Sequence, residues 1–250
     1  MTLRIIAKLD VKPPYVVKPV HFEGLRKVGK PAELAHKYYK QGADEIIYID
    51  IVASLYQREL IVPHIQESSE KVLVPLGVGG GVRNLDDFSS LFHSGADKVL
   101  INTEAVQRNP ELINQASQTF GAQSVVLNIE AKKLPSGSWE CYTDCGRIRS
   151  SKDVLDWVKE AAQRGAGEIV LQSVDCDGRR RGFDLELIQQ VVNSVDIPVV
   201  AASGAGSLED ILSVAQIPNL GGIAIASLLH YDEYTIEDIR VFLREHGVEV

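Results

Sequence analysis

The stretch Leu76–Thr103, LGVGGGVRNLDDFSSLFHSGADKVLINT, is the most informative part of this 250-residue chain. Its first apolar run predicts a buried strand that ends in three glycines, Gly79–Gly81, and a helical pattern begins near Asn84. Glycine lets backbone N–H groups approach a ligand closely, and a helix N-terminus adds positive partial charge. A second apolar run ends at Asn102 and Thr103, so two strand ends are expected to meet at one anion, which we interpret as a phosphate. A plain tight turn accounts equally well for a single glycine-rich segment.

The same pattern returns about 120 residues later, which indicates an internal duplication. A proline within an apolar run again precedes a glycine-rich turn, and the matching segments keep their order along the chain. This spacing is far longer than that of solenoid repeats, so we predict two copies of one half-domain, about 1–122 and 123–250. The paired segments are LDVK (9–12) with IEAK (129–132), GADEI (42–46) with GAGEI (165–169), Pro75 with Pro198, and Asn102–Thr103 with Ala226–Ser227.

Length and composition indicate one enzyme-sized domain. A chain of 250 residues with 45% hydrophobic residues is the usual size of a single α/β barrel. The net charge of −8 argues against a nucleic-acid partner. No apolar run is long enough to span a membrane, the first residues do not form a signal peptide, and the three cysteines lack metal-binding spacing. We therefore expect a cytoplasmic protein without a metal or another cofactor.

Strand and helix patterns alternate along the whole chain, which predicts an α/β fold with a parallel sheet. Two halves of four such units close most naturally into a (βα)8 TIM barrel, in which the active site lies at the C-terminal ends of the strands. A long loop is expected over 11–30, and a hairpin over 133–142 that extends the fifth strand. The expected strands are 4–10, 45–50, 73–78, 98–101, 124–130, 168–173, 197–201 and 222–226, and the expected helices are 31–41, 57–70, 85–94, 110–119, 152–164, 184–194, 207–215 and 235–245.

Polar residues at the ends of these strands are the candidates for a functional site. Asp10 and Glu130 occupy equivalent positions in the two halves, so two carboxylates are expected on opposite walls of the barrel. The two glycine-rich turns also face each other, which predicts a long substrate with a phosphate at each end and acid–base chemistry between them. Asp50 and Asp177 could equally cap turns, and Lys18 could be a solvated lysine. The candidates are Asp10, Asp50, Gly80, Gly81, Asn102, Thr103, Glu130, Asp177, Ser203, Gly204 and Ser227.

Charged residues stand at the starts of four strands, at the opposite end of the barrel. They are Arg4, Glu45, Lys98 and Glu168, two cations and two anions. If all four point inward, they form a ring at the bottom of the barrel. A structural cluster of salt bridges is the simplest interpretation of such a ring.

The motifs together resemble the cyclase subunit of imidazole glycerol phosphate synthase, over Arg4 to about Gly247. The resemblance implies a (βα)8 barrel of two half-barrels that uses ammonia from a glutaminase subunit docked on its N-terminal face. It implies conversion of a bis-phosphorylated ribulosyl-formimino substrate to imidazole glycerol phosphate and an aminoimidazole carboxamide ribotide. The motifs are LDV (9–11), VVK (16–18), DIVAS (50–54), VGGGVR (78–83), GADKVLINT (95–103), GAGEI (165–169), DCDG (175–178) and SGAG (203–206).

The resemblance also implies roles for individual residues. The two catalytic aspartates of the family fall on Asp10 and Glu130, and the mobile-loop lysine falls on Lys18. The charged ring of Arg4, Glu45, Lys98 and Glu168 falls on the ammonia gate of the family. Phosphate contacts fall on Gly81, Asn102 and Thr103 at one end of the substrate, and on Asp177, Gly178, Gly204 and Ser227 at the other.

Departures from the family pattern concentrate around the expected ligand. Glu130 replaces an aspartate, and Lys8 replaces the cysteine before LDV. Lys8 should lie just beneath Asp10, because strand residues two apart face the same way, and its charge would hold Asp10 ionised. Asn128 is expected inside the barrel as well, within reach of Lys8. The other replacements are Val52, Gln172 and Arg179 for threonines and Ser203 for a glycine.

Three functions therefore remain open at this stage. The first is the cyclase reaction of histidine biosynthesis. The second is a divergent paralogue that delivers ammonia to a nucleotide-activated sugar in surface-polysaccharide synthesis. The third is a non-catalytic partner that binds a phosphorylated metabolite and activates a glutaminase.

Overall fold

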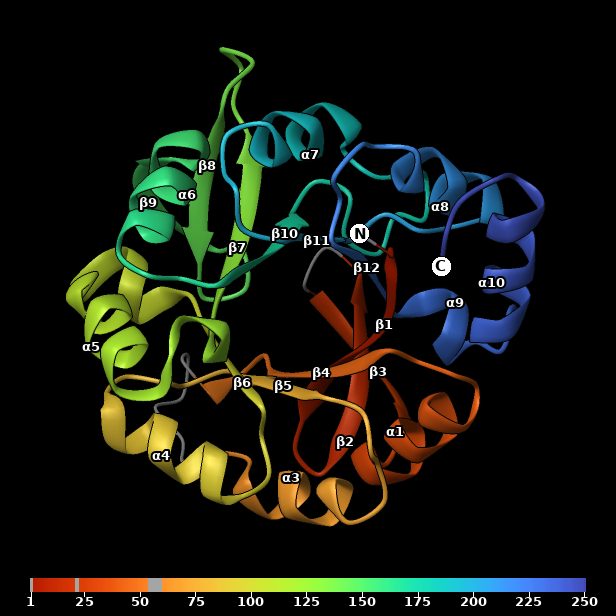
Figure 1. The fold of residues 1–250 in the computed structure, drawn as a ribbon, viewed down its shortest axis with the longest axis horizontal. Helices are drawn as coiled ribbons and strands as arrows, with labels where there is room; N and C mark the ends of the chain where they lie inside the picture. Colours follow the sequence, from red (N-terminus) through yellow and green to blue (C-terminus); the bar gives the residue numbers. More distant parts are fainter. Residues whose placement is uncertain (1, 21–22, 54–59) are drawn as a thin grey trace.

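The computed structural model describes residues 2–20, 23–53 and 60–250 and confirms the expected (βα)8 barrel (Figure 1). Eight parallel strands pair in a ring, and the pairings of β12 with β1 and of β7 with β10 complete the closure. Glu168 of β10 pairs with Val126 of β7, and Arg4 of β1 pairs with Gly222 of β12. In the order of the ring, the strands are β1 (Arg4–Lys12), β4 (Glu45–Asp50), β5 (Leu76–Gly79), β6 (Lys98–Ile101), β7 (Val125–Lys133), β10 (Glu168–Ser173), β11 (Val199–Ala202) and β12 (Gly222–Ile225).

Helices surround the ring of strands, as Figure 1 shows. The helices after the two glycine-rich turns, α4 and α8, begin in the same way, because the side chains of Asn84 and Ser207 accept hydrogen bonds from backbone N–H groups of the first turn. The helices are α1 (Pro31–Lys40), α3 (Val62–Ser69), α4 (Leu85–His93), α5 (Glu111–Phe120), α6 (Val154–Gln163), α7 (Leu185–Val192), α8 (Leu208–Ala215), α9 (Ser227–His230) and α10 (Ile236–Glu245), with η1 (Glu104–Arg108) and η2 (Ala122–Ser124). None of the described helices is long and apolar enough to cross a membrane.

Several element boundaries differ from expectation, among them those of the third strand and the second helix. The third strand begins at Leu76 rather than at residue 73, so the run before it is not part of the sheet. Helix α3 begins at Val62 and ends at Ser69. The first residues of the predicted helix over 57–70 lie outside the described part of the chain.

Antiparallel strands extend the barrel at its mouth on two opposite sides. The predicted hairpin is confirmed, because β8 (Trp139–Thr143) pairs with β7, and β9 (Ile148–Asp153) adds a further strand. The loop predicted over 11–30 is wrong: it contains β2 (Tyr15–Val20), paired with β1, and β3 (Glu23–Gly29). The prolines of this segment suggested a loop, but Val16 is fully buried and continues the sheet.

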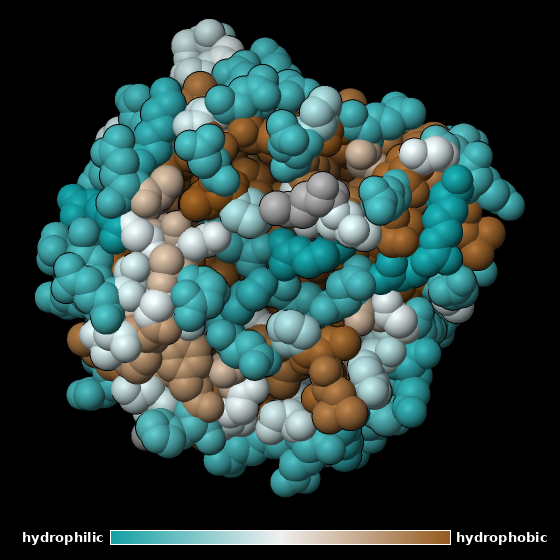
Figure 2. All heavy atoms as spheres, in the orientation of Figure 1, coloured by the Kyte–Doolittle hydropathy of each residue, from teal (hydrophilic) through white to brown (hydrophobic). Residues whose placement is uncertain are grey.

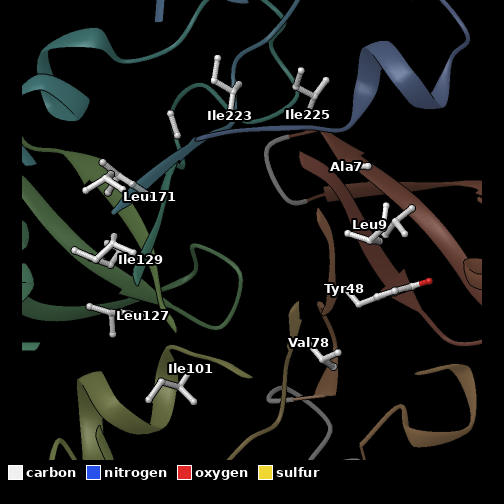
Figure 3. Packing of buried hydrophobic residues seen from close by; sticks show 14 of the residues in the cluster. Ala7, Leu9, Tyr48, Val78, Ile101, Leu127, Ile129, Leu171, Ile223 and Ile225 are labelled. Atoms are coloured by element: carbon white, nitrogen blue, oxygen red, sulfur yellow. The ribbon is translucent and has the colours of Figure 1, made fainter. Parts of the chain in front are cut away.

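The strand wall separates two hydrophobic cores, because successive side chains of a strand point to opposite faces. One core fills the space between strands and helices, and Figure 3 shows its labelled members, from Ala7 and Leu9 to Ile223 and Ile225, around the barrel. The other core lies inside the barrel and is much smaller. Its buried members are Ile6, Val17, Ile47, Ile49, Ile51, Val52, Leu100, Val126, Val170, Val200, Ala202 and Ala224.

Polar and charged residues gather near the barrel axis. In Figure 2 hydrophilic residues occupy the centre of the face shown, between more apolar regions. The inner apolar core therefore lies between two polar ends, the charged ring at the strand starts and the cavities at the strand ends.

Candidate functional site

A cavity lined by several charged groups lies at the C-terminal ends of the strands. This main cavity has a volume of about 430 Å³. Its wall includes Asp10 and Glu130 from opposite strands, together with Lys8, which also lines a second cavity. Gly80, Gly81, Asn102 and Thr103 line it at the ends of β5 and β6. The structure thus brings the first predicted phosphate site and both predicted carboxylates to one cavity.

No residue larger than glycine fits at position 80 without strain. Its φ is +102°, and a Cβ atom would lie 2.3 Å from the carbonyl oxygen of Asp50. The close approach of backbone to backbone leaves the turn open toward the cavity. Gly204, in the glycine-rich turn of the second half, has a φ of +123°, and a Cβ atom there would lie 2.3 Å from the carbonyl oxygen of Gly182.

Asp10 is almost completely buried and lies between two lysines. Lys8 Nζ donates a hydrogen bond to Asp10 Oδ1, and Lys18 Nζ lies 3.6 Å from Asp10 Oδ2. Burial alone would raise the pKa of Asp10, but the charges of Lys8 and Lys18 outweigh it and hold this pKa below the ordinary aspartate value. Asp10 is therefore ionised at neutral pH, as the position of Lys8 in the sequence suggested.

The surroundings of Glu130 shift its pKa in the opposite direction to that of Asp10, upward. Its side chain is buried, and Glu130 Oε2 accepts a hydrogen bond of 2.7 Å from Gly146 N. Burial raises the pKa of Glu130 to about 7, although the Gly146 N–H and the charge of Lys8 act in the other direction. The cavity thus holds one carboxylate that is ionised and one that keeps a proton near neutral pH.

Two amides form the floor of the main cavity beside Lys8. Gln172 Nε2 donates to Asn128 Oδ1 at 2.7 Å, so Asn128 is engaged by Gln172 rather than by Lys8 as expected. Gln172 Oε1 is buried without a hydrogen-bond partner. The pair joins β7 to β10 directly beneath Glu130, because Gln172 pairs with Glu130 in the strand register.

Asp50 adopts the role of a turn cap in the structure. Its Oδ1 accepts hydrogen bonds from the backbone N–H groups of Val52 and Ala53, at 2.9 and 3.0 Å. The same residue lines the main cavity. Asn102 Nδ2 donates to Tyr142 O at 3.3 Å, while Asn102 Oδ1 is buried without a partner.

A small cavity of about 20 Å³ lies at the second glycine-rich turn. Lys18 Nζ and Ser203 Oγ each lie 3.3 Å from Asp177 Oδ1, so these side chains satisfy one another where a ligand was expected. Burial alone would lower the pKa of Lys18, but Asp177 and Asp10 raise it above the ordinary lysine value. Lys18 is thus a buried ion-pair partner and not a solvated lysine. Gly178, Gly204 and Ser227 also line this cavity.

At the bottom of the barrel the four charged residues meet in a closed ring. Arg4 Nη1 and Lys98 Nζ each lie 2.7 Å from Glu45 Oε2. Arg4 Nη2 also pairs with Glu168 Oε1, and Lys98 Nζ lies 2.7 Å from Glu168 Oε2. Each cation therefore bridges both carboxylates, and the two carboxylates are nearly inaccessible to solvent.

Several residues at the site were missed by reading the sequence. Arg83 and Arg108 line the main cavity, and Arg83 Nη2 is buried without a partner. His230 lies near Lys8 and Lys18. Burial is the largest cause that lowers its pKa, to about 4, and the charge of Lys18 is the next. Arg83 directly follows the glycine-rich turn, which was a usable signal, whereas nothing local marks His230. Within the described residues no cluster of three His, Cys, Asp or Glu side chains could hold a metal ion.

Comparison with known proteins assigns the chain to a family. The family model described as "Histidine biosynthesis protein" matches residues 4–235. A Legionella pneumophila protein named "Imidazole glycerol phosphate synthase subunit HisF" is 51% identical over 208 residues, which cover 83% of this chain and 98% of that protein.

Two further relatives carry the same name. Those from Helicobacter hepaticus and Streptococcus mutans are each 42% identical over 247 residues, or 99% of this chain and 97% and 98% of their own lengths. The match extends over both half-barrels and both cavities. The chain therefore belongs to the HisF family of imidazole glycerol phosphate synthase subunits.

Proposed function

We propose that this chain is the cyclase subunit of an imidazole glycerol phosphate synthase. It would combine ammonia with a bis-phosphorylated ribulosyl-formimino substrate and release imidazole glycerol phosphate and an aminoimidazole carboxamide ribotide. The shared name of the relatives from three genera supports this reaction over the two alternatives. The observation that carries the mechanism is the unequal protonation of Asp10 and Glu130 in one cavity.

Ring closure with ammonia needs two proton transfers. A base must accept a proton from the added nitrogen, and an acid must supply one to the departing group. Two carboxyl groups whose environments separate their pKa values can divide these tasks. Asp10, held ionised by Lys8 and Lys18, would be the base, and Glu130, with a pKa of about 7, would be the acid.

Lys8 gives this division of roles its physical basis. Its ammonium group contacts Asp10 and lies deep in the barrel wall, with 4% of the residue exposed. A cation at this position stabilises the charged form of Asp10 more than that of Glu130, because only Asp10 bonds to it. The longer side chain of Glu130 reaches the N–H of Gly146, which would fix the acid on its own wall.

The two ends of the substrate would bind at the two glycine-rich turns. Gly80, Gly81, Asn102 and Thr103 would hold one phosphate in the main cavity, beside Arg83. Gly178, Gly204 and Ser227 would hold the other after Lys18 and Asp177 rearrange. Lys18 would then pair with the phosphate or with Asp10, which gives this buried lysine a function in substrate binding.

Ammonia would come from a glutaminase subunit bound to the N-terminal face. The ring of Arg4, Glu45, Lys98 and Glu168 would form the gate on that face. The same end of the barrel carries Leu73, which is 83% exposed and lines a cavity of about 340 Å³ with Val72, Val74 and Pro75. Apolar surface of this kind is expected where a partner protein binds.

A turnover assay tests the proposal directly. The purified chain receives the ribulosyl-formimino substrate and an ammonium salt at mildly alkaline pH, which supplies free ammonia without a glutaminase. We expect imidazole glycerol phosphate from the natural protein and a loss of about 100-fold or more in Asp10→Asn and Glu130→Gln. Asp86→Asn, an exposed carboxylate of α4, serves as the control and should retain full activity.

The opposite result has a clear meaning. A folded chain that stimulates a glutaminase but forms no product from ammonia would contradict the cyclase reaction. Equal activity of Glu130→Gln and the natural protein would contradict the role of Glu130 while leaving the reaction itself intact.

A further inference from the structure

A third cavity lies beside the main one, on the far side of the turn that follows β8. This lateral cavity has a volume of about 250 Å³ and shares Cys145 with the main cavity. Lys132 reaches it from the end of β7, Arg147 from the turn between β8 and β9, and Arg179 from the loop after β10. Each of three separate elements therefore contributes one cation to the lining of this cavity.

The three cations have no anionic partner within the described part of the chain. None of Lys132, Arg147 and Arg179 forms an ion pair there within 4.0 Å, although most other arginines of the chain do. Asp175 also lines the cavity, and its Oδ2 accepts a hydrogen bond of 2.8 Å from Lys133 N, so the lining carries three cations and one carboxylate. Like charges gathered in a chain of net charge −8 are unfavourable unless an anion joins them.

We propose that the lateral cavity binds the phosphate group of a phosphorylated small molecule. Two arginines present planar donor groups that match phosphate oxygens, and a lysine adds a third positive charge. The volume is below the range of about 300 Å³ and more that is typical of larger ligands, and it suits one phosphate group with a few water molecules. Neither glycine-rich turn contributes to this cavity.

The position of the cavity connects it to the acid–base pair. Gly146 lines the lateral cavity, and its N–H donates to Glu130 Oε2 in the main cavity. Asp144, Cys145 and Gly146 all have positive φ values of 52°, 60° and 70°, so the turn between the cavities has a tightly defined backbone. An anion that draws Arg147 inward would act on the turn that holds Glu130.

The phosphate has two possible sources, and both use the same chemistry. It could be a separate anion, or part of a substrate that extends from the main cavity past Cys145. The site itself does not depend on the cyclase reaction. Its test is therefore a binding measurement that can fail or succeed independently of turnover.

Calorimetric titration with inorganic phosphate provides this test. The natural protein should show two binding components, one from the main cavity and one from the lateral cavity. Arg147→Gln/Arg179→Gln should weaken the second component at least about tenfold, because each arginine contributes a charge-assisted bond. The control Lys159→Gln/Arg244→Gln removes the same charge from exposed residues of α6 and α10 and should bind phosphate like the natural protein.

Substrate kinetics then identify the source of the phosphate. A raised KM for the substrate in Arg147→Gln/Arg179→Gln means that the substrate reaches the lateral cavity, whereas an unchanged KM means that a separate anion fills it. A phosphate isotherm that is the same in this variant and in the natural protein would overturn the proposal. Because both arginines are exposed, the variant is expected to fold normally.

Discussion

The two glycine-rich turns have similar backbones but open into very different spaces. The first lies on a cavity of about 430 Å³ in which the donor Arg83 Nη2 is left without a partner. The second lies on about 20 Å³, and Lys18 and Asp177 occupy the remaining space as an ion pair. One site is ready for an anion, whereas the other must first give up an internal charge pair. The glycine pattern thus predicts where an anion can bind, and the neighbouring side chains decide whether the place is free.

The largest expected effect comes from removing the ion pair that fills the second glycine-rich turn. Lys18→Met removes the partner of Asp177 and one partner of Asp10, both of which are buried. A buried charge left unpaired costs about 3–5 kcal/mol, and the free energy of unfolding in urea should fall by that amount. Lys27→Met on β3 loses only a contact 4.4 Å from the Tyr15 ring and should lose less than about 1 kcal/mol. Equal losses in the two variants would show that the Lys18 pair does not close the second site.

Glu130, which lines the main cavity beside the first glycine-rich turn, should make the stability of the protein depend on pH. The pKa of Glu130 is raised from 4.5 to about 7 by burial, so the folded protein holds this proton more tightly than the unfolded chain. Stability should therefore fall as the pH rises from about 4.5 to 7 and then level off. Glu130→Gln removes this penalty and should raise the free energy of unfolding at pH 8 by about 3 kcal/mol, with little gain at pH 4.

Urea unfolding of Glu130→Gln at the two pH values checks this expectation. Glu209→Gln, an exposed glutamate of α8, should show no such difference between pH 4 and pH 8. A gain in Glu130→Gln that is equal at both pH values would mean that ionisation of Glu130 is not its cause.

The smallest effect concerns phosphate as an inhibitor. Of the two glycine-rich turns, inorganic phosphate at low concentration should bind only the first and compete with substrate there, because binding at the second requires the Lys18–Asp177 contact to break. Asn102→Ala should therefore raise the inhibition constant about tenfold, the usual value of one charge-assisted hydrogen bond. Ser227→Ala should change it less than about threefold. The reverse order would mean that the small cavity opens readily in solution.

The fold could be read from the sequence because each strand and helix carries its own local signal. The strand 98–101 and the helix after Asn84 were predicted almost to the residue, since an apolar run, a cap and glycines mark them. The strands β2 and β3 were missed because three prolines conceal their pattern. The pairing of β2 with β1 depends on burial of Val16, which is a property of the finished barrel.

The site was predictable only where its contacts are local. Lys8 and Asp10 are two residues apart on one strand, so their contact followed from strand geometry. Lys18 and Asp177 are distant in sequence, and no pattern of either segment indicates that they meet. The same holds for Gln172, which binds Asn128 and thereby leaves Lys8 to Asp10. Which cavity is open, and which carboxylate keeps its proton, depends on these long-range pairs.

The apolar layer inside the barrel has a consequence for anything that travels along the axis. Ile6, Ile47, Leu100, Val126 and Val170 separate the charged ring from the floor of the main cavity. An ion crossing this layer would lose its hydration and gain no partner, at a cost of several kcal/mol, whereas a small neutral molecule would cross at little cost. The layer therefore sorts by charge rather than by size. Ammonia could pass where ammonium could not, and the barrel would deliver its nucleophile already deprotonated.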